Sequence, residues 1–359
     1  MKKREYVPVA VLSAVCVSLW LIPPPERVAD DSAATSPAKV VAVDDSDIQL
    51  AGLLEYGTQH LTVELPDGGR RRAENELRAQ CELDKKFKVG DTALVVLGDE
   101  PLTAKDRYRL GWMVVFFAAF AAALVFSCGW VGAKALFSFV FSCLVVWKLL
   151  VPLALAGVSA SRVSFAAVML LTAVIMYLVA GATRKGFCAF LGAVLGVGSS
   201  LLLARFFSLM MHVDGAAMPY VQALIYSGYA ELDLSDIFIG SAILASSGAV
   251  MDLAMDISAG VSEVRLHNPA LSRRELFRSG IRIGRAVVGT MTTTLLLAYS
   301  GGYLTLLMVF AAQGTPPLDF LNTSLVSSEV VKTLVGSFGI VLVAPFTALV
   351  SAWIFSKRS

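Results

Sequence analysis

Long apolar segments alternate with short polar connections along most of the chain. They lie at about 7–22, 110–128, 135–156, 163–182, 186–208, 236–257, 286–312 and 334–355. Each is near or above the roughly 20 residues that cross the hydrocarbon core of a bilayer as a helix. The pattern predicts an all-α polytopic membrane protein with about eight transmembrane helices.

The one long polar stretch lies between the first two apolar segments and has a different pattern. Within residues 26–107, the short segments "KVVAV", "DIQLA", "HLTVEL" and "TALVVL" read as strands, and "PDGG" reads as a turn between extended segments. We expect a small β-rich domain here, with "FKVGDTALVVL" as the last strand of a barrel. The predicted organisation is an N-terminal signal-anchor helix at 1–25, this domain at 26–107, and a seven-helix membrane domain at 108–359.

Composition agrees with a membrane protein and excludes some functions. The chain is 56% hydrophobic and 16% charged, against about 45–50% and 25% in soluble proteins. Residues 26–109 carry a net charge of −5 and the remainder +7, without the concentrated basic patch of a nucleic-acid-binding protein. The five cysteines and three histidines are scattered, so we expect neither a metal site built on them nor a cofactor.

Basic residues predict the orientation in the cell membrane. With the N-terminus inside, fourteen Lys and Arg fall on inner segments and three on the short outer ones, as the positive-inside rule requires. Both termini are then cytoplasmic, and residues 26–107 are extracytoplasmic. The first apolar run could be a cleaved signal peptide, but no small-x-small site directly follows it, which favours an uncleaved anchor.

Two acids interrupt an apolar segment in "SSGAVMDLAMDISAG" (246–260). Asp252 and Asp256 are four residues apart and share a helix face with Gly248. Asp252 lies about 23 Å along the helix from Ile237, which is within the membrane, so it should face the protein interior. The acids form structural ion pairs, with Arg282 or Arg285 as partners, or they bind a cation or proton, or both only mark the membrane boundary.

The next apolar segment adds neutral oxygens and a break. Thr290 and Thr294 share a face near the expected depth of Asp252. The glycines Gly301 and Gly302, in "YSGGY", indicate either a simple kink or the kind of discontinuous helix that lines sites in transporters. Glu329 precedes the last segment on the outer side, as a solvated charge or as an outer gate residue.

Small residues also recur at helical spacing. Gly192, Gly196 and Ser200 are four apart, which lets another helix approach closely, either within the chain or across a subunit interface. No nucleophile–base set, phosphate-binding loop or HExxH motif occurs in the membrane domain, and one helix cannot converge two carboxylates as an aspartyl protease does. We therefore do not expect an enzyme.

Residues 246–310 and 321–352 resemble the YibE/F-like family of bacterial polytopic membrane proteins. The resembling residues are Gly248, Asp252, Asn268, Pro269, Gly280, Gly284, Arg285, Gly289, Thr290, Met291, Thr293, Gly301, Asn322, Glu329, Gly336, Gly339, Pro345 and Thr347. The chain departs from the family pattern at Asp256, usually a small polar residue, and at Ala286, often an acid. The resemblance implies an integral membrane protein with an exported N-terminal domain.

Two functions remain open from the sequence. In one, the protein is a transporter or permease for a small solute or ion, with Asp252 and Asp256 in the site and Thr290 and Thr294 supplying neutral oxygens, since such oxygens suit hard cations. In the other, it is a scaffold or envelope-assembly factor whose exported domain binds a partner. The expected partners are the lipid bilayer and a small solute or cation, with copies of the chain or an envelope partner as further candidates. We expect no contact with nucleic acid.

Overall fold

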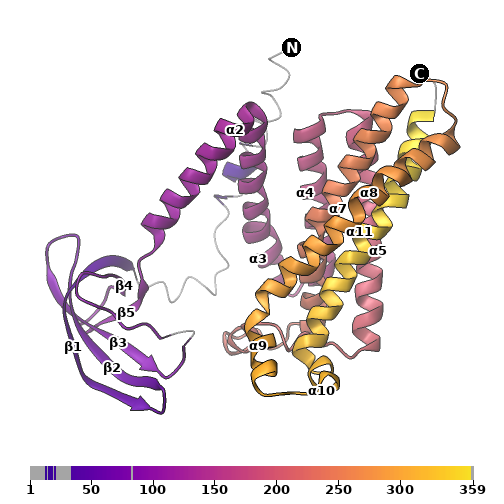
Figure 1. Ribbon diagram of the computed structural model, residues 1–359. Coiled ribbons are helices and arrows are strands. Elements are labelled where there is room, and N and C mark those ends of the chain that lie inside the picture. The colour runs from indigo at the N-terminus through magenta and orange to yellow at the C-terminus, as the bar shows by residue number, and fades with distance from the viewer. Residues whose placement is uncertain (1–12, 14, 19, 22–33, 82–83, 357–359) are drawn as a thin grey trace. The chain divides into compact units, whose positions relative to one another are not determined.

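The chain divides into two compact units, Pro24–Gly129 and Met1–Pro23 with Trp130–Ser359 (Figure 1). The computed structural model describes residues 13, 15–18, 20–21, 34–81 and 84–356. Most of the expected signal-anchor helix at 1–25 therefore lies outside the described residues.

Five strands of the first unit form a closed barrel in the order β1-β2-β3-β5-β4. The strands are β1 (Thr35–Ala51), β2 (Leu54–Glu64), β3 (Arg70–Arg78), β4 (Thr92–Val96) and β5 (Leu102–Arg107). Alternate side chains point inward, and the core includes Val40, Val63, Phe87, Val95 and Leu102. The expected small β-barrel is confirmed.

The strands differ from the sequence-based expectation in three places. The segment "FKVGDTALVVL" contains β4 and not the last strand, because β5 follows it at Leu102–Arg107. The segments "KVVAV" and "DIQLA" belong to one long strand, β1, whose register against β2 shifts between Asp44 and Asp47. Strand β3 has the sequence RRRAENELR, in which only Ala73, Asn75 and Leu77 are buried. Its polar outer face hides the strand from a search for apolar runs.

Six helical segments are long and apolar enough to cross a membrane among the described residues. They are Leu110–Leu155, Ala160–Ala180, Arg184–Met210, Leu234–His267, Arg273–Gly302 and Ser324–Ser356. The first includes α2 (Leu110–Val145), the π-helical turn η2 (Val146–Leu150) and α3 (Val151–Leu155). It covers both segments expected at 110–128 and 135–156, and its 46 residues would extend about 69 Å if straight. Gly129, with φ 55° and ψ −130°, breaks the helix.

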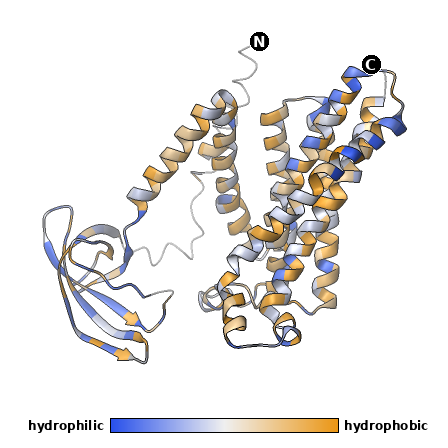
Figure 2. Ribbon diagram, in the orientation of Figure 1, coloured by the Kyte–Doolittle hydropathy of each residue, from blue (hydrophilic) through white to orange (hydrophobic). Residues whose placement is uncertain are grey.

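The second unit is a helical bundle built around α7 (Figure 1). Its other long helices are α4 (Ala160–Ala180), α5 (Arg184–Met210), α8 (Arg273–Gly302) and α11 (Ser324–Ser356), and α7 spans Leu234–His267. The short helices are α6 (Val221–Tyr226), α9 (Leu304–Ala312) and α10 (Pro317–Leu321). Figure 2 shows hydrophobic residues along these helices and hydrophilic residues where α7 joins α8.

Small residues set the contact between α5 and α11. A Cβ placed on Gly196 would lie 2.8 Å from the Cβ of Val343, and one on Gly192 would overlap Thr347. The Ser200 hydroxyl donates to the carbonyl of Val335 at 3.4 Å. The stripe predicted from spacing therefore packs within the chain.

Candidate functional site

Helix α7 contacts α4, α5, α8 and α11, and one of its sides is left open among the residues that the structure describes. Gly248, Asp252 and Asp256 lie there and are all exposed, and a Cβ on Gly248 would meet no atom within 4 Å. The buried positions Val250, Ile257 and Val261 occupy the opposite side of the helix. We refer to Gly248, Asp252 and Asp256 as the open stripe of α7.

The expectation that Asp252 faces the protein interior is wrong in this structure. The reason is helical geometry: at 100° per residue, Asp252 falls on the far side from Val250 and Ile257, which pack in the core. The four-residue spacing correctly placed both acids on one face, but spacing alone does not say which neighbour that face meets.

Packing contacts place α7 and α8 in antiparallel register. A Cβ on Gly284 of α8 would lie 3.2 Å from Cδ1 of Ile257, and one on Gly280 would lie 3.0 Å from Cγ2 of Val261. When this register is continued towards the N-terminus of α7 and the C-terminus of α8, Gly289 and Thr290 lie at the same level as Asp252. The sequence-based estimate that these groups share a depth therefore agrees with the register.

Thr290 and Thr294 are exposed, and their hydroxyls donate to their own helix. Thr290 bonds to the carbonyl of Val287 at 2.9 Å and Thr294 to that of Thr290 at 2.9 Å. Each hydroxyl oxygen keeps acceptor capacity for a cation or a donor. Neither threonine hydroxyl hydrogen-bonds to Asp252 in the described part of the chain, so the groups share a depth without a hydrogen bond between them.

The expected pairing of Asp256 with an arginine is absent from the ion pairs of the described residues. The same register places Arg285 level with Asp256, but Gly284 is the position that packs towards Ile257. Residue 285 is turned by about 100° from it. Arg282 and Arg285 are both exposed, and neither acid of the open stripe has a cationic partner among the described residues.

A second candidate site lies where α8 ends. Helix α8 stops at Gly302, Tyr303 leaves helical geometry, and α9 starts at Leu304, so the helix is interrupted beside its paired glycines. A cavity of about 250 Å³ adjoins this interruption, lined by Tyr299, Tyr303 and Glu329 among mostly apolar residues of α8, α9 and α11.

Glu329 is not the solvated charge that its sequence position allows. It lies inside α11, which starts ten residues before the apolar segment expected at 334–355. Its carboxylate is 2.9 Å from Nζ of Lys332, and the two side chains are only 13% and 14% exposed. Nζ of Lys332 also lies 5.4 Å from the ring centroid of Phe238, at cation–π distance.

The cavity contains an orphaned polar atom. The Tyr299 hydroxyl is buried and has no hydrogen-bond partner among the described residues; a group of this kind costs free energy unless a ligand or water satisfies it. Sequence reasoning identified Gly301, Gly302 and Glu329 but missed Tyr299, Tyr303 and Lys332. The tyrosines flanking "SGG" were the available signal.

The structure thus separates the predicted site residues into two groups. Asp252, Asp256, Thr290 and Thr294 lie on exposed positions of α7 and α8, whereas Glu329 lines the cavity near the end of α8. Among the described residues, no group of three or more His, Cys, Asp or Glu could hold a metal ion. Both places offer oxygen atoms at helices long enough to span a bilayer.

The family comparison covers this helical part of the chain. The model of the YibE/F-like protein family matches residues 116–357, which include both groups of candidate residues. No curated protein and no solved structure matches the chain. The match extends over most of the sequence and agrees with the residues that carry the resemblance, so the chain belongs to the YibE/F-like family.

Proposed function

We propose that the protein is a permease for a small ion or solute and that the open stripe of α7 lines its pathway. The observation that carries the proposal is the exposure of Asp252 and Asp256 on the central helix of the bundle, with no cationic partner within the described part of the chain. A charged side chain facing hydrocarbon at mid-membrane costs roughly 2.5–3.5 kcal/mol on insertion scales. Water or a bound cation on this side of α7 would remove that cost.

The chemistry of the stripe favours a hard cation, proton included. Carboxylate and hydroxyl oxygens are the ligands that such ions prefer, and Thr290 supplies a hydroxyl at the level of Asp252. The interrupted helix and the cavity at Glu329 support the same proposal, because transporters place their sites beside discontinuous helices that can move. Glu329 would act at the outer end of the pathway.

The proposed orientation has both termini in the cytoplasm and the barrel outside the cell membrane. It rests on the excess of Lys and Arg on the segments assigned to the inner side. A reporter at Asn268 should then be cytoplasmic and one at Gly68 extracytoplasmic. Detection of Gly68 inside the cell would overturn the orientation without touching the site.

Flux into vesicles tests transport. The purified protein is reconstituted, and uptake of H⁺, Na⁺, K⁺ and Mg²⁺ is measured for wild type, Asp252→Asn and Glu263→Gln. Asp252→Asn keeps the side-chain shape and removes the charge, so we expect uptake of the transported ion to be lost. Glu263→Gln removes an exposed acid on the same face, about two turns beyond Asp256 at the C-terminal end of α7, and should leave uptake intact. Wild-type uptake by Asp252→Asn would remove the acid from the mechanism.

A scaffold function has one specific observation in its favour. The tip of the β1–β2 hairpin exposes Leu50 and Leu53, whose side chains are 74% and 98% exposed. Exposed leucines grouped at one hairpin tip could belong to an apolar patch of the kind that binds a partner. If the barrel is a docking domain and the helices an anchor, Leu53→Ser should abolish the cellular phenotype of the protein, while Asp252→Asn should leave it unchanged.

A further inference from the structure

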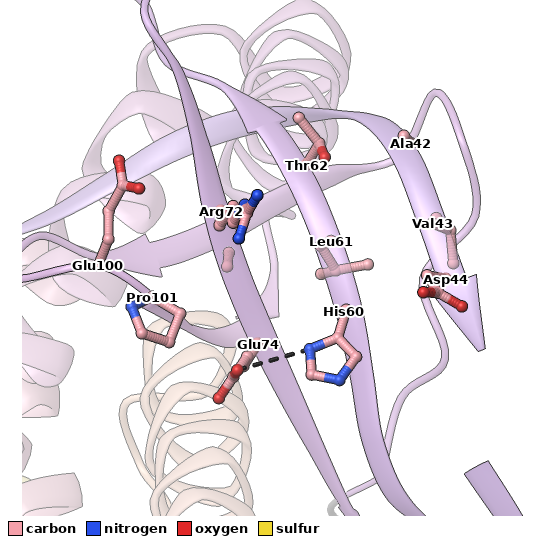
Figure 3. A pocket seen from close by; sticks show the side chains of 11 residues that line it. Ala42, Val43, Asp44, His60, Leu61, Thr62, Arg72, Glu74, Glu100 and Pro101 are labelled. Carbon is pink, nitrogen blue, oxygen red and sulfur yellow. Dashed lines mark ion pairs between the residues drawn. The ribbon is translucent and has the colours of Figure 1, made fainter. Parts of the chain in front are cut away.

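The outer face of the barrel carries two rows of side chains across three strands. Asp44, His60 and Glu74 are register partners on β1, β2 and β3, and Ala42, Thr62 and Arg72 form the neighbouring row. Glu100 and Pro101, between β4 and β5, border the same face. Together these residues line a groove of about 610 Å³, and Figure 3 shows their side chains. This volume is within the range of sites that bind small molecules.

The charged side chains of the first row interact with each other and with neighbouring residues of the barrel. Nε2 of His60 lies 2.8 Å from a carboxylate oxygen of Asp47, and Nδ1 lies 3.5 Å from one of Glu74. Asp44 accepts a hydrogen bond from the backbone N–H of Ser46 at 3.0 Å. The row therefore has a fixed arrangement with a net negative charge at its Asp44 and Glu74 ends.

Arg72 and Glu100 are different, because neither belongs to an ion pair among the described residues. In Figure 3 Arg72 lies near the middle of the groove, with Glu100 on one side and the His60–Glu74 pair on the other. The other two residues in the row of Arg72, Ala42 and Thr62, have small side chains and form the floor beside it. The groove thus presents one free guanidinium between carboxylates, above a floor with space for a ligand.

We propose that this groove binds a short peptide with free ends, whose carboxylate pairs with Arg72 and whose ammonium group pairs with Glu74 or Glu100. A guanidinium binds a carboxylate with two parallel hydrogen bonds. Arg72 and Glu74 are two positions apart on one face of β3, which separates their Cα atoms by about 6.6 Å. Two extended residues span at most about 7 Å, so the ends of a dipeptide match this separation.

Dialanine is the probe because its methyl groups suit the small floor. Binding is measured by isothermal titration calorimetry on the full chain in nanodiscs, for wild type, Arg72→Gln, Glu100→Gln and Arg71→Gln. Arg71 is exposed on the same strand but does not line the groove, so it is the matched control. We expect Arg72→Gln to weaken binding by roughly 10-fold or more, as loss of a charged hydrogen-bond pair predicts, and Arg71→Gln to leave it unchanged.

Blocked peptides test each end separately. N-acetyl-dialanine lacks the ammonium group, dialanine amide lacks the carboxylate, and both should bind at least several-fold more weakly than dialanine. Glu100 lies in the loop between β4 and β5, so we expect Glu100→Gln to fold. It therefore tests the groove even if Arg72→Gln does not fold. The proposal is overturned if dialanine gives no heat of binding, if either blocked peptide binds as tightly, or if neither groove variant changes affinity. None of these results depends on whether the membrane domain transports an ion.

Discussion

Replacement of Gly196 by alanine should destabilise the helical bundle through a single close contact. The new Cβ would lie 2.8 Å from the Cβ of Val343 and 3.0 Å from Cγ1 of Val250, whereas carbon atoms in good contact are about 3.5–4.0 Å apart. Both neighbours are fully buried β-branched residues in helices, so neither can rotate away easily. Overpacking of this kind costs about 1–3 kcal/mol.

Gly198→Ala is the matched control, because it isolates the contact from helix propensity. Both changes exchange glycine for alanine in α5 and gain the same roughly 0.8–1.0 kcal/mol of propensity. A Cβ on Gly198, however, would meet only a ring carbon of Phe165 at 3.9 Å. The two variants should therefore differ by the overpacking cost alone.

Thermal unfolding in detergent measures this difference. For a domain of 150–250 residues, 1 kcal/mol corresponds to about 2–4 °C in Tm, so Gly196→Ala should melt roughly 2–12 °C below Gly198→Ala. Gly196→Leu should lower Tm further or prevent assembly. Equal Tm values for the two alanine variants would show that α5 and α11 do not pack through Gly196.

Two further predictions concern the barrel. The hydrogen bond to Asp47 raises the pKa of His60 above 6.5. The stability that this pair contributes is therefore fully present below pH 6.5 and is lost as pH rises through the folded-state pKa. A midpoint of the His60 NMR titration at or below 6.5 would contradict this prediction. Gln59→Ala should reduce hydrogen-exchange protection of β2, because Gln59 donates to the carbonyl of Phe87 at 3.0 Å and accepts from its N–H at 2.9 Å. Each buried backbone group left unpaired costs about 1–3 kcal/mol, and unchanged exchange would refute the role of Gln59.

The apolar runs at 163–182, 186–208, 236–257 and 334–355 each correspond to one long helix, because the bilayer imposes a length and a composition on a membrane helix. The limits of this pattern appear where two segments join. The runs at 110–128 and 135–156 lie on either side of Gly129, where the backbone leaves helical geometry and two helices meet without an intervening loop. The residues between these runs include one charge, Lys134, and are otherwise apolar or small, so no polar loop marked the boundary.

The candidate site was predicted in its spacing but not in its surroundings. The shared face of Asp252 and Asp256, and the depth of Thr290, follow from helix geometry alone. Which side of α7 meets other helices depends on tertiary contacts such as Gly284 with Ile257, and these are not encoded in local pattern. The same limit explains Glu329: its place in α11 beside Lys332 is local, but its burial depends on α8 and α9.

Strand β3 shows the converse limit in the barrel. Its sequence is dominated by charges because one face is exposed, and the two polar residues Gln59 and Asn75 take inward positions on β2 and β3, where they hydrogen-bond to each other at 3.1 Å. A satisfied buried network replaces the apolar alternation that normally identifies a strand. The groove on the outer face is likewise a product of strand register, which a single sequence does not reveal.

Thiol accessibility of the open stripe tests the central claim most directly. The five native cysteines are replaced, and single cysteines are introduced as Gly248→Cys in the stripe and Leu195→Cys, an exposed apolar position near the middle of α5. Both proteins are treated in vesicles with a charged, membrane-impermeant maleimide. If the stripe lines an aqueous pathway, Gly248→Cys is labelled and protected by the transported ion, while Leu195→Cys stays unlabelled. A Gly248→Cys protein that resists the reagent as Leu195→Cys does would contradict a water-filled path along α7.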